Sequence, residues 1–148
     1  MNYYLLIDTS IQGEVRVGIF DGEKIVAKKC AKVEFKYSEK ILTVIDSTFG
    51  GLRINELNGV LVVVGPGRFS ALRVGVTVAN TLGWGLGIPV LGVESIQGVL
   101  SIEDKRKYWQ EIEKLITVNI KKMFKKKKFD KFIVPEYGQE PNITLKKI

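Results

Sequence analysis

The sequence contains no histidine and a single cysteine, Cys30. Without histidine, the chain lacks the side chain used most often in general acid-base catalysis, in catalytic triads and as a metal ligand. One cysteine excludes both a disulfide within the chain and a cysteine-ligated metal site. The commonest hydrolytic and metal-dependent chemistries are therefore unavailable, and we expect no catalytic residues, no metal and no cofactor.

Long hydrophobic runs are also missing. No stretch of about 18 apolar residues occurs, which is the length that a membrane-spanning helix needs. The N-terminal apolar stretch has no basic segment before it, so we expect an untargeted, soluble, cytoplasmic protein without membrane contact. Apolar residues make up 45% of the 148, enough for the core of one domain, or of one lobe with a short appendage.

The net charge of +7 is concentrated near the C-terminal end of the sequence. Seven lysines lie between residues 121 and 131, interleaved with phenylalanines and accompanied by one acidic residue, Asp130. Such a cluster is typical of an RNA-binding surface, because lysines contact phosphates. A solvated lysine-rich face is the alternative interpretation. The lysines considered for RNA contact are Lys121, Lys122, Lys125, Lys126, Lys127 and Lys128.

The N-terminal part predicts three antiparallel strands. Residues 3–8 form the first, and residues 15–19 alternate apolar with polar or small residues, the period of a half-buried strand. Asp21 and Gly22 predict a tight hairpin turn, after which residues 24–33 return as the third strand. Ser38 then predicts the N-cap of a helix that ends at about Thr48, with Tyr37 and Leu42 as a hydrophobic staple.

The stretch from Val60 to Ser95 predicts a βαβ unit. Residues 60–64 are apolar throughout, typical of a strand buried on both faces, and residues 90–93 form a second short strand. A helix from about Phe69 to Leu86 connects them, so the strands are expected to be parallel. The resulting order is βββαβαβ, a mixed α/β sheet with helices.

Small residues occupy every fourth position of that connecting helix. A row of this kind lets another element approach closely, although each interior glycine costs about 1 kcal/mol relative to alanine. The element that covers the row is either the first helix of the same chain or a helix of a partner. The row consists of Ala71, Gly75, Ala79, Gly83 and Gly87.

The segment after Ser101 changes character. Apolar residues between Tyr108 and Phe124 recur at helical spacing and favour an amphipathic helix of about 20 residues, although residues 116–120 also alternate as a strand would. Residues 132–134 predict a last short strand.

Two turns are candidate anion sites. Asp8, Thr9 and Ser10 end the first strand as a phosphate-facing loop would, or they satisfy backbone groups of a turn. The Gly65 to Arg68 turn precedes a helix N-terminus, where free backbone amides favour anions, but it matches no Walker or dinucleotide motif.

Three motifs in this order resemble the TsaB (YeaZ) family. They are residues 7–10 with the following hairpin, residues 86–95, and the turn with its helix start, Gly65-Pro66-Gly67-Arg68-Phe69-Ser70-Ala71-Leu72-Arg73-Val74-Gly75. The last is similar to the family signature Gly-Pro-Gly-Ser-Phe-Thr-Gly-Leu-Arg, from which Arg68, Ser70 and Ala71 depart. Residues 135–144 resemble the family's tail.

The resemblance implies an actin-like ATPase (ASKHA, ribonuclease H-like) N-terminal lobe over residues 1–101. It further implies a non-catalytic subunit in the synthesis of tRNA threonylcarbamoyladenosine. In that family the subunit pairs with the catalytic paralogue TsaD, and TsaE joins the assembly, so tRNA contact is expected to be indirect. Residues 102–148 then represent a strongly shortened second lobe, too small to close a nucleotide cleft, and Asp8 to Ser10 are a vestigial phosphate loop.

The resemblance places the partner surface on the two helices of the lobe. The same surface predicts a homodimer in isolation. Its expected residues are Ile41, Leu42, Ile45, Leu72, Arg73, Gly75, Val76, Ala79 and Gly83. The alternatives are a small ATPase or kinase that uses Asp8 and the Gly65 turn, and a tRNA-binding module that uses the lysine cluster.

Overall fold

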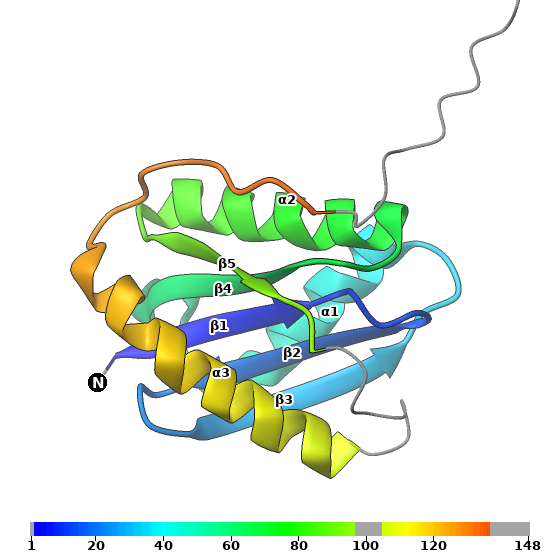
Figure 1. The fold of residues 1–148 in the computed structure, drawn as a ribbon, viewed down its shortest axis with the longest axis horizontal. Helices are drawn as coiled ribbons and strands as arrows, with labels where there is room; N and C mark the ends of the chain where they lie inside the picture. The colour runs from blue at the N-terminus through cyan, green and yellow to red at the C-terminus, as the bar shows by residue number, and fades with distance from the viewer. Residues whose placement is uncertain (1, 97–104, 137–148) are drawn as a thin grey trace, which may run out of the picture.

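The structure is a computed structural model and describes residues 2–96 and 105–136. The chain forms one sheet with helices on both faces (Figure 1). Each face therefore carries its own hydrophobic core. In chain order the elements are β1 (Tyr3–Asp8), β2 (Glu14–Phe20), β3 (Ile25–Lys32), α1 (Tyr37–Phe49), a 3-10 turn (Ile54–Glu56), β4 (Leu57–Gly65), α2 (Phe69–Leu86), β5 (Val90–Glu94) and α3 (Lys105–Lys125).

The sheet has the spatial order β3-β2-β1-β4-β5. The first three strands are antiparallel to one another, whereas β4 runs parallel to both β1 and β5. The turn between β2 and β3 follows from its sequence: the Asp21 carboxylate accepts the amide protons of Glu23 and Lys24, and Gly22 has a φ of 98°. The expected hairpin, the three antiparallel strands and the parallel βαβ unit are all confirmed.

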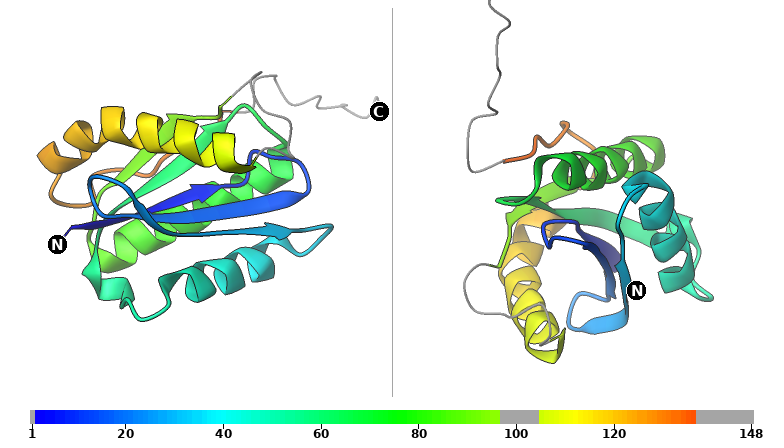
Figure 2. Two further views of the ribbon diagram at one scale, coloured as in Figure 1. Left: turned by 90° about the horizontal axis from the view of Figure 1, so that it is seen from below. Right: turned by 90° about the vertical axis from the view of Figure 1, so that its right-hand side faces the viewer.

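Helices α1 and α2 cover one face of the sheet (Figure 2). Apolar side chains from alternate positions of the strands, such as Leu5 and Val62, meet Ile41, Ile45 and Val76 of the helices there. All five of these side chains are buried. The apolar stripes predicted for both helices therefore point into the chain's own core.

Helix α3 covers the opposite face, as the side view in Figure 2 shows. Its buried stripe includes Trp109, Ile112 and Ile116, which pack on strand residues such as Leu6 and Leu61. The helix expected after Ser101 is confirmed and the alternative strand at residues 116–120 is wrong. The boundary expected near residue 101 lies outside the described residues, and α3 beyond it packs on the same sheet.

Strand β2 is fully buried because α3 packs on it, so the prediction of a half-buried strand is wrong. Its alternation indicated a half-buried strand, but every residue from Glu14 to Phe20 is buried. Gly18 lies under the Trp109 ring, where an added Cβ would be 3.0 Å from the nearest ring carbon. The polar and small positions of β2 are therefore covered by a helix that lies about 90 residues further along the chain.

Two local predictions are wrong. Ser38 does not cap α1, because the helix already starts at Tyr37, after Lys36 in a left-handed conformation with φ 62°. The expected staple is not formed: Leu42 is 56% exposed and the Tyr37 hydroxyl instead accepts the Gly13 amide proton at 3.2 Å.

The segment after α3 runs along α2 without forming the strand expected at residues 132–134 (Figure 1). The Asn80 side chain of α2 holds it in place by donating to the Ile133 carbonyl at 2.9 Å and accepting the Ile133 amide proton at 2.8 Å. The Glu136 amide donates to the carbonyl of Val64 at 2.7 Å. Most of the tail motif at residues 135–144 lies outside the described residues. Among the described helices, none is long and apolar enough to cross a membrane.

Candidate functional site

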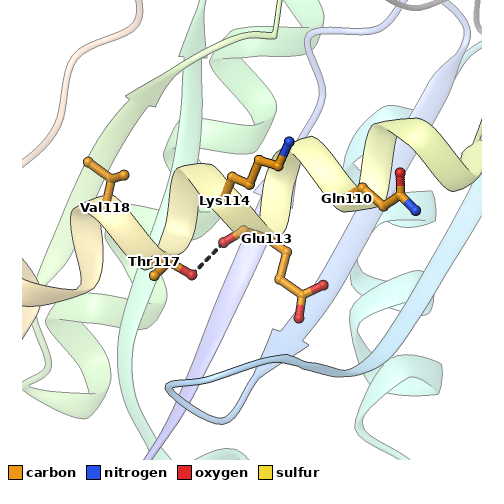
Figure 3. Close-up of a pocket in the computed structure, with 5 residues that line it drawn as sticks. All are labelled: Gln110, Glu113, Lys114, Thr117 and Val118. Atoms are coloured by element: carbon orange, nitrogen blue, oxygen red, sulfur yellow. Dashed lines mark hydrogen bonds between the residues drawn. The ribbon is translucent and has the colours of Figure 1, made fainter.

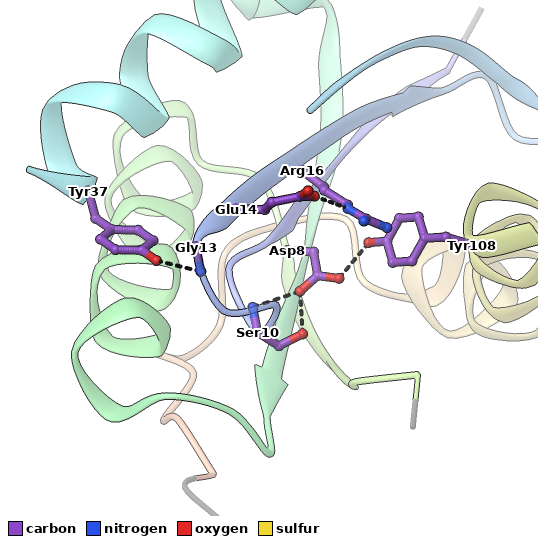
Figure 4. Close-up of polar contacts among 7 residues, drawn as sticks. All are labelled: Asp8, Ser10, Gly13, Glu14, Arg16, Tyr37 and Tyr108. Atoms are coloured by element: carbon purple, nitrogen blue, oxygen red, sulfur yellow. Dashed lines mark hydrogen bonds and ion pairs between the residues drawn. The ribbon is translucent and has the colours of Figure 1, made fainter. Parts of the chain in front are cut away.

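Helix α3 lies against the loop that follows β1, and its Tyr108 side chain points toward Asp8 (Figure 4). The Asp8 carboxylate accepts the Ser10 amide proton at 2.8 Å and the Ser10 hydroxyl proton at 2.5 Å through one oxygen. Its other oxygen accepts the hydroxyl proton of Tyr108 at 2.5 Å. Asp8 is 1% exposed, so both of its oxygens are engaged within the chain and the carboxylate is not open to a ligand from solvent.

An ion pair extends this polar group. Arg16 Nε donates to the Glu14 carboxylate at 2.8 Å, and both side chains are buried. The Arg16 guanidinium also lies over the Tyr108 ring, 4.1 Å from its centroid. Burial and then the neighbouring Asp8 charge raise the pKa of Tyr108 well above its ordinary value, so the phenol stays a neutral donor. We call Asp8, Glu14, Arg16 and Tyr108 the buried polar cluster.

Sequence reasoning found Asp8 but missed the other three members of the buried polar cluster. Tyr108 was assigned to an apolar helix stripe, and Arg16 to the open face of a half-exposed strand. The sequence does contain a sign of this burial. Glu14, Arg16 and Gly18 are two residues apart and therefore share one face of the strand, which is buried if a helix packs on it. The apolar stripe of the predicted last helix required such a face.

The signature turn packs directly on the Asp8 loop. An added Cβ at Gly67 would lie 3.0 Å from Ser10 Cα, and Thr9 Oγ1 donates to the Ala71 carbonyl of α2 at 2.8 Å. Pro66, Arg68 and Phe69 are exposed. The Ser95 amide closes the turn from β5 by donating to Gly65 O at 2.9 Å. The signature therefore joins β4, α2 and the Asp8 loop into one rigid corner.

The residues expected at the partner surface separate into two groups. Leu42 and Arg73 are exposed, whereas the other seven are buried inside this chain. The small-residue row faces the sheet: an added Cβ at Gly75 would lie 2.5 Å from Thr9 Oγ1, and one at Gly83 would collide with Val90. The buried members of the row therefore pack inside this chain, whereas Gly87 at the end of the helix is exposed. The buried seven are Ile41, Ile45, Leu72, Gly75, Val76, Ala79 and Gly83.

The outer face of α1 and α2 remains open along the seam between the two helices. One hollow of about 390 Å³ has an apolar floor that includes Val74 and Val78, with Ser38 and Arg73 at its rim. A second, of about 340 Å³, is lined by residues that include Leu42 and Leu82. We call these two hollows together the helix seam.

A larger hollow, of about 550 Å³, follows the outward side of α3 (Figure 3). Its lining is polar apart from Val118, and the Thr117 hydroxyl donates to the Glu113 carbonyl within the helix. No group of three His, Cys, Asp or Glu side chains able to hold a metal occurs among residues 2–96 and 105–136. We find no catalytic arrangement along α3.

The six lysines considered for RNA contact lie at the end of α3 and just beyond it. Lys126 is half-buried and forms a salt bridge with Asp130 at 3.1 Å, while the other five are exposed. This end of α3 lies on the opposite side of the sheet from the helix seam (Figure 2).

Comparison with known proteins identifies the family. The model for TsaD, tRNA N6-adenosine threonylcarbamoyltransferase, matches residues 31–110. The tRNA threonylcarbamoyladenosine biosynthesis protein TsaB of Bacillus subtilis (strain 168) is 27% identical over 95 residues, which is 63% of this chain and 41% of that protein. The tRNA N6-adenosine threonylcarbamoyltransferase of Geotalea uraniireducens (strain Rf4) is 36% identical over 64 residues, which is 42% of this chain and 19% of that protein.

Solved structures agree on the fold. YeaZ from Pseudomonas aeruginosa superposes with a TM-score of 0.58 at 21% identity, covering 64% of this chain and 44% of that one. The present chain spans less than half the length of each of these relatives. The expected actin-like, ribonuclease H-like α/β fold is confirmed. On the match to residues 31–110 and the likeness to TsaB and YeaZ, the chain belongs to the TsaD family and, within it, resembles the TsaB (YeaZ) proteins.

Proposed function

We propose that this chain is a non-catalytic adaptor in the synthesis of tRNA threonylcarbamoyladenosine, and that it binds a TsaD-type catalytic subunit through the helix seam. The observation that carries the proposal is the open apolar seam between α1 and α2, where Leu42 is 56% exposed. Protein interfaces have an apolar centre and a polar rim, and the seam has both.

The buried polar cluster supports an adaptor over an enzyme. The ATPase alternative requires the Asp8 carboxylate to reach a ligand, whereas Asp8 is engaged by Ser10 and Tyr108. Helix α3 covers the sheet face beside it. We therefore expect no saturable heat with ATP and magnesium in calorimetry, and binding that Asp8→Ala abolishes would favour the ATPase alternative.

The test of the adaptor role is co-elution with the cognate TsaD-type subunit in size-exclusion chromatography. We expect one earlier peak that contains both proteins at micromolar concentration, and separate elution would contradict the proposal. A TsaE-type ATPase added to that complex is expected to join it.

In the absence of the catalytic subunit, we propose that the seam pairs two copies of this chain. A monomeric mass by light scattering at high concentration would exclude that dimer.

A further inference from the structure

The end of α3 carries a concentrated positive charge that the fold does not neutralise. We call Lys121, Lys122, Lys125, Lys127 and Lys128 the lysine surface; all five are exposed. Within the described part of the chain, the salt bridge in this region joins Lys126 to Asp130, neither of which belongs to the lysine surface. Five ammonium groups within eight residues therefore face solvent together.

Helix stability accounts for only part of this charge. Lys122 and Lys125 lie in the last turn of α3, where a cation interacts favourably with the helix dipole. Lys127 and Lys128 follow after the helix has ended, so the dipole does not explain them. Like charges at this spacing repel one another and lower stability, an effect that a bound polyanion would reverse.

An exposed aromatic ring lies among these lysines. Phe124 is 46% exposed, and its ring packs edge to face against Tyr4 with 5.8 Å between the centroids. Beside it, a hollow of about 340 Å³ is lined by residues that include Asn2, Asn58 and Lys127. Aromatic rings stack on unpaired bases, and amide side chains can hydrogen-bond to base edges.

We propose that the lysine surface binds an unpaired segment of RNA, with its phosphates on the lysines and a base against Phe124. The choice of RNA over other polyanions rests on the proposed function in tRNA modification and on the combination of a flat ring, amides and cations at one place. Helix α3, which carries Lys121, Lys122 and Lys125, lies on the opposite face of the sheet from α1 and α2 (Figure 2). We therefore expect the chain to bind RNA and a protein partner at the same time.

The test is fluorescence anisotropy with a labelled single-stranded RNA of about 12 nucleotides and with an unmodified tRNA transcript. The test variant changes all five residues of the lysine surface to Gln. The matched control has the same net charge as the test variant and changes five other exposed lysines to Gln: Lys28, Lys29, Lys32, Lys36 and Lys40. The first three lie on β3, Lys36 lies between β3 and α1, and Lys40 lies in the first turn of α1. Circular dichroism verifies that both variants are folded.

We expect the test variant to raise the Kd at least tenfold, and the control variant to stay within twofold of the wild type. The slope of log Kd against log salt should fall by up to about 3.5, since each of the five lost phosphate contacts on single-stranded RNA contributes about 0.7. Equal losses in both variants, or none in either, would overturn the proposal. Binding to vesicles of anionic lipid without binding to RNA would overturn it in favour of a membrane surface.

A second variant tests the stacking contact. Phe124→Leu keeps the apolar volume but removes the flat ring, so it should weaken binding to single-stranded RNA three- to tenfold and leave binding to a duplex of the same length unchanged. Equal effects on both RNAs would contradict the stacking role. Co-elution of the five-Gln variant with the TsaD-type subunit separates the two proposals, because unchanged RNA binding by this variant together with intact co-elution rejects this inference and leaves the adaptor role standing.

Discussion

Tyr108 joins α3 to the sheet at the residue scale. Its hydroxyl donates to Asp8 at the end of β1, its ring lies beneath Arg16 of β2, and its backbone belongs to α3, which covers that face of the sheet. Asp8 is therefore held inside the protein by Tyr108 on one carboxylate oxygen and by Ser10 on the other.

Tyr108→Phe should lower the free energy of unfolding by about 1–3 kcal/mol, because it leaves one oxygen of the buried Asp8 without its donor. Urea denaturation followed by circular dichroism measures the change. Tyr37→Phe is the control, because its hydroxyl makes a hydrogen bond at a partly exposed position and its loss should cost less. Equal costs in the two variants would mean that Asp8 does not depend on Tyr108.

The raised pKa of Tyr108 has a consequence for stability at alkaline pH. Because the folded chain holds this phenol neutral above its ordinary pKa near 10, the unfolded chain loses the proton first as pH rises. The stability that Tyr108 contributes is therefore complete below about pH 10 and is lost above it, at up to about 1.4 kcal/mol per pH unit. Denaturation series from pH 8 to 11 should show the difference between wild type and Tyr108→Phe shrinking with pH. A constant difference would contradict the assignment.

At the element scale, α2 is shaped by its contacts inside the chain. Gly75 lies against Thr9, whose hydroxyl bonds to the Ala71 carbonyl one turn earlier. A bulky residue at Gly75 is therefore expected to disturb the folding of this chain. The close approach that the row of small residues indicated is real, but the approaching residues belong to this chain: Thr9 after β1 at Gly75, and Val90 of β5 at Gly83.

Gly75→Leu should destabilise the chain by about 1–3 kcal/mol or more, because its side chain would enter space that Thr9 occupies. Gly85 provides the control within the same helix, since nothing lies within 4 Å of an added Cβ there. Gly85→Ala should raise stability by about 0.5–1 kcal/mol through helix propensity. Thermal unfolding of both variants measures this, and a neutral Gly75→Leu would show that the row is not packed on the sheet.

The sequence predicted the elements well where one local pattern decided them. The apolar run at Val60 and the glycine-bounded helix after it specify their own structure, and so does the Asp21–Gly22 turn. The local alternation of β2 did not show the burial of Arg16, because the helix that covers it, α3, lies about 90 residues away in the sequence and the two patterns have to be read together. Seven of the nine residues expected at the partner surface are buried inside this chain, because an apolar residue indicates burial but not whether the covering side chains belong to its own chain.

At the scale of the whole molecule, α3 changes what the fold can do. In this chain α3 covers one face of the sheet, and the Asp8 loop is closed with it. The helix seam and the lysine surface remain open to solvent. A molecule with a sealed centre and two distinct outer surfaces is suited to connecting other molecules.

The most direct test of the adaptor account is the Kd for the cognate TsaD-type subunit, measured by calorimetry for wild type, Leu42→Asp and Val118→Asp. Both positions carry exposed apolar side chains, Leu42 at the helix seam and Val118 on α3. If the seam is the interface, Leu42→Asp should weaken binding at least tenfold, about 1.4 kcal/mol, while Val118→Asp binds as the wild type does. Unchanged binding by Leu42→Asp, or an equal loss with Val118→Asp, would contradict the account.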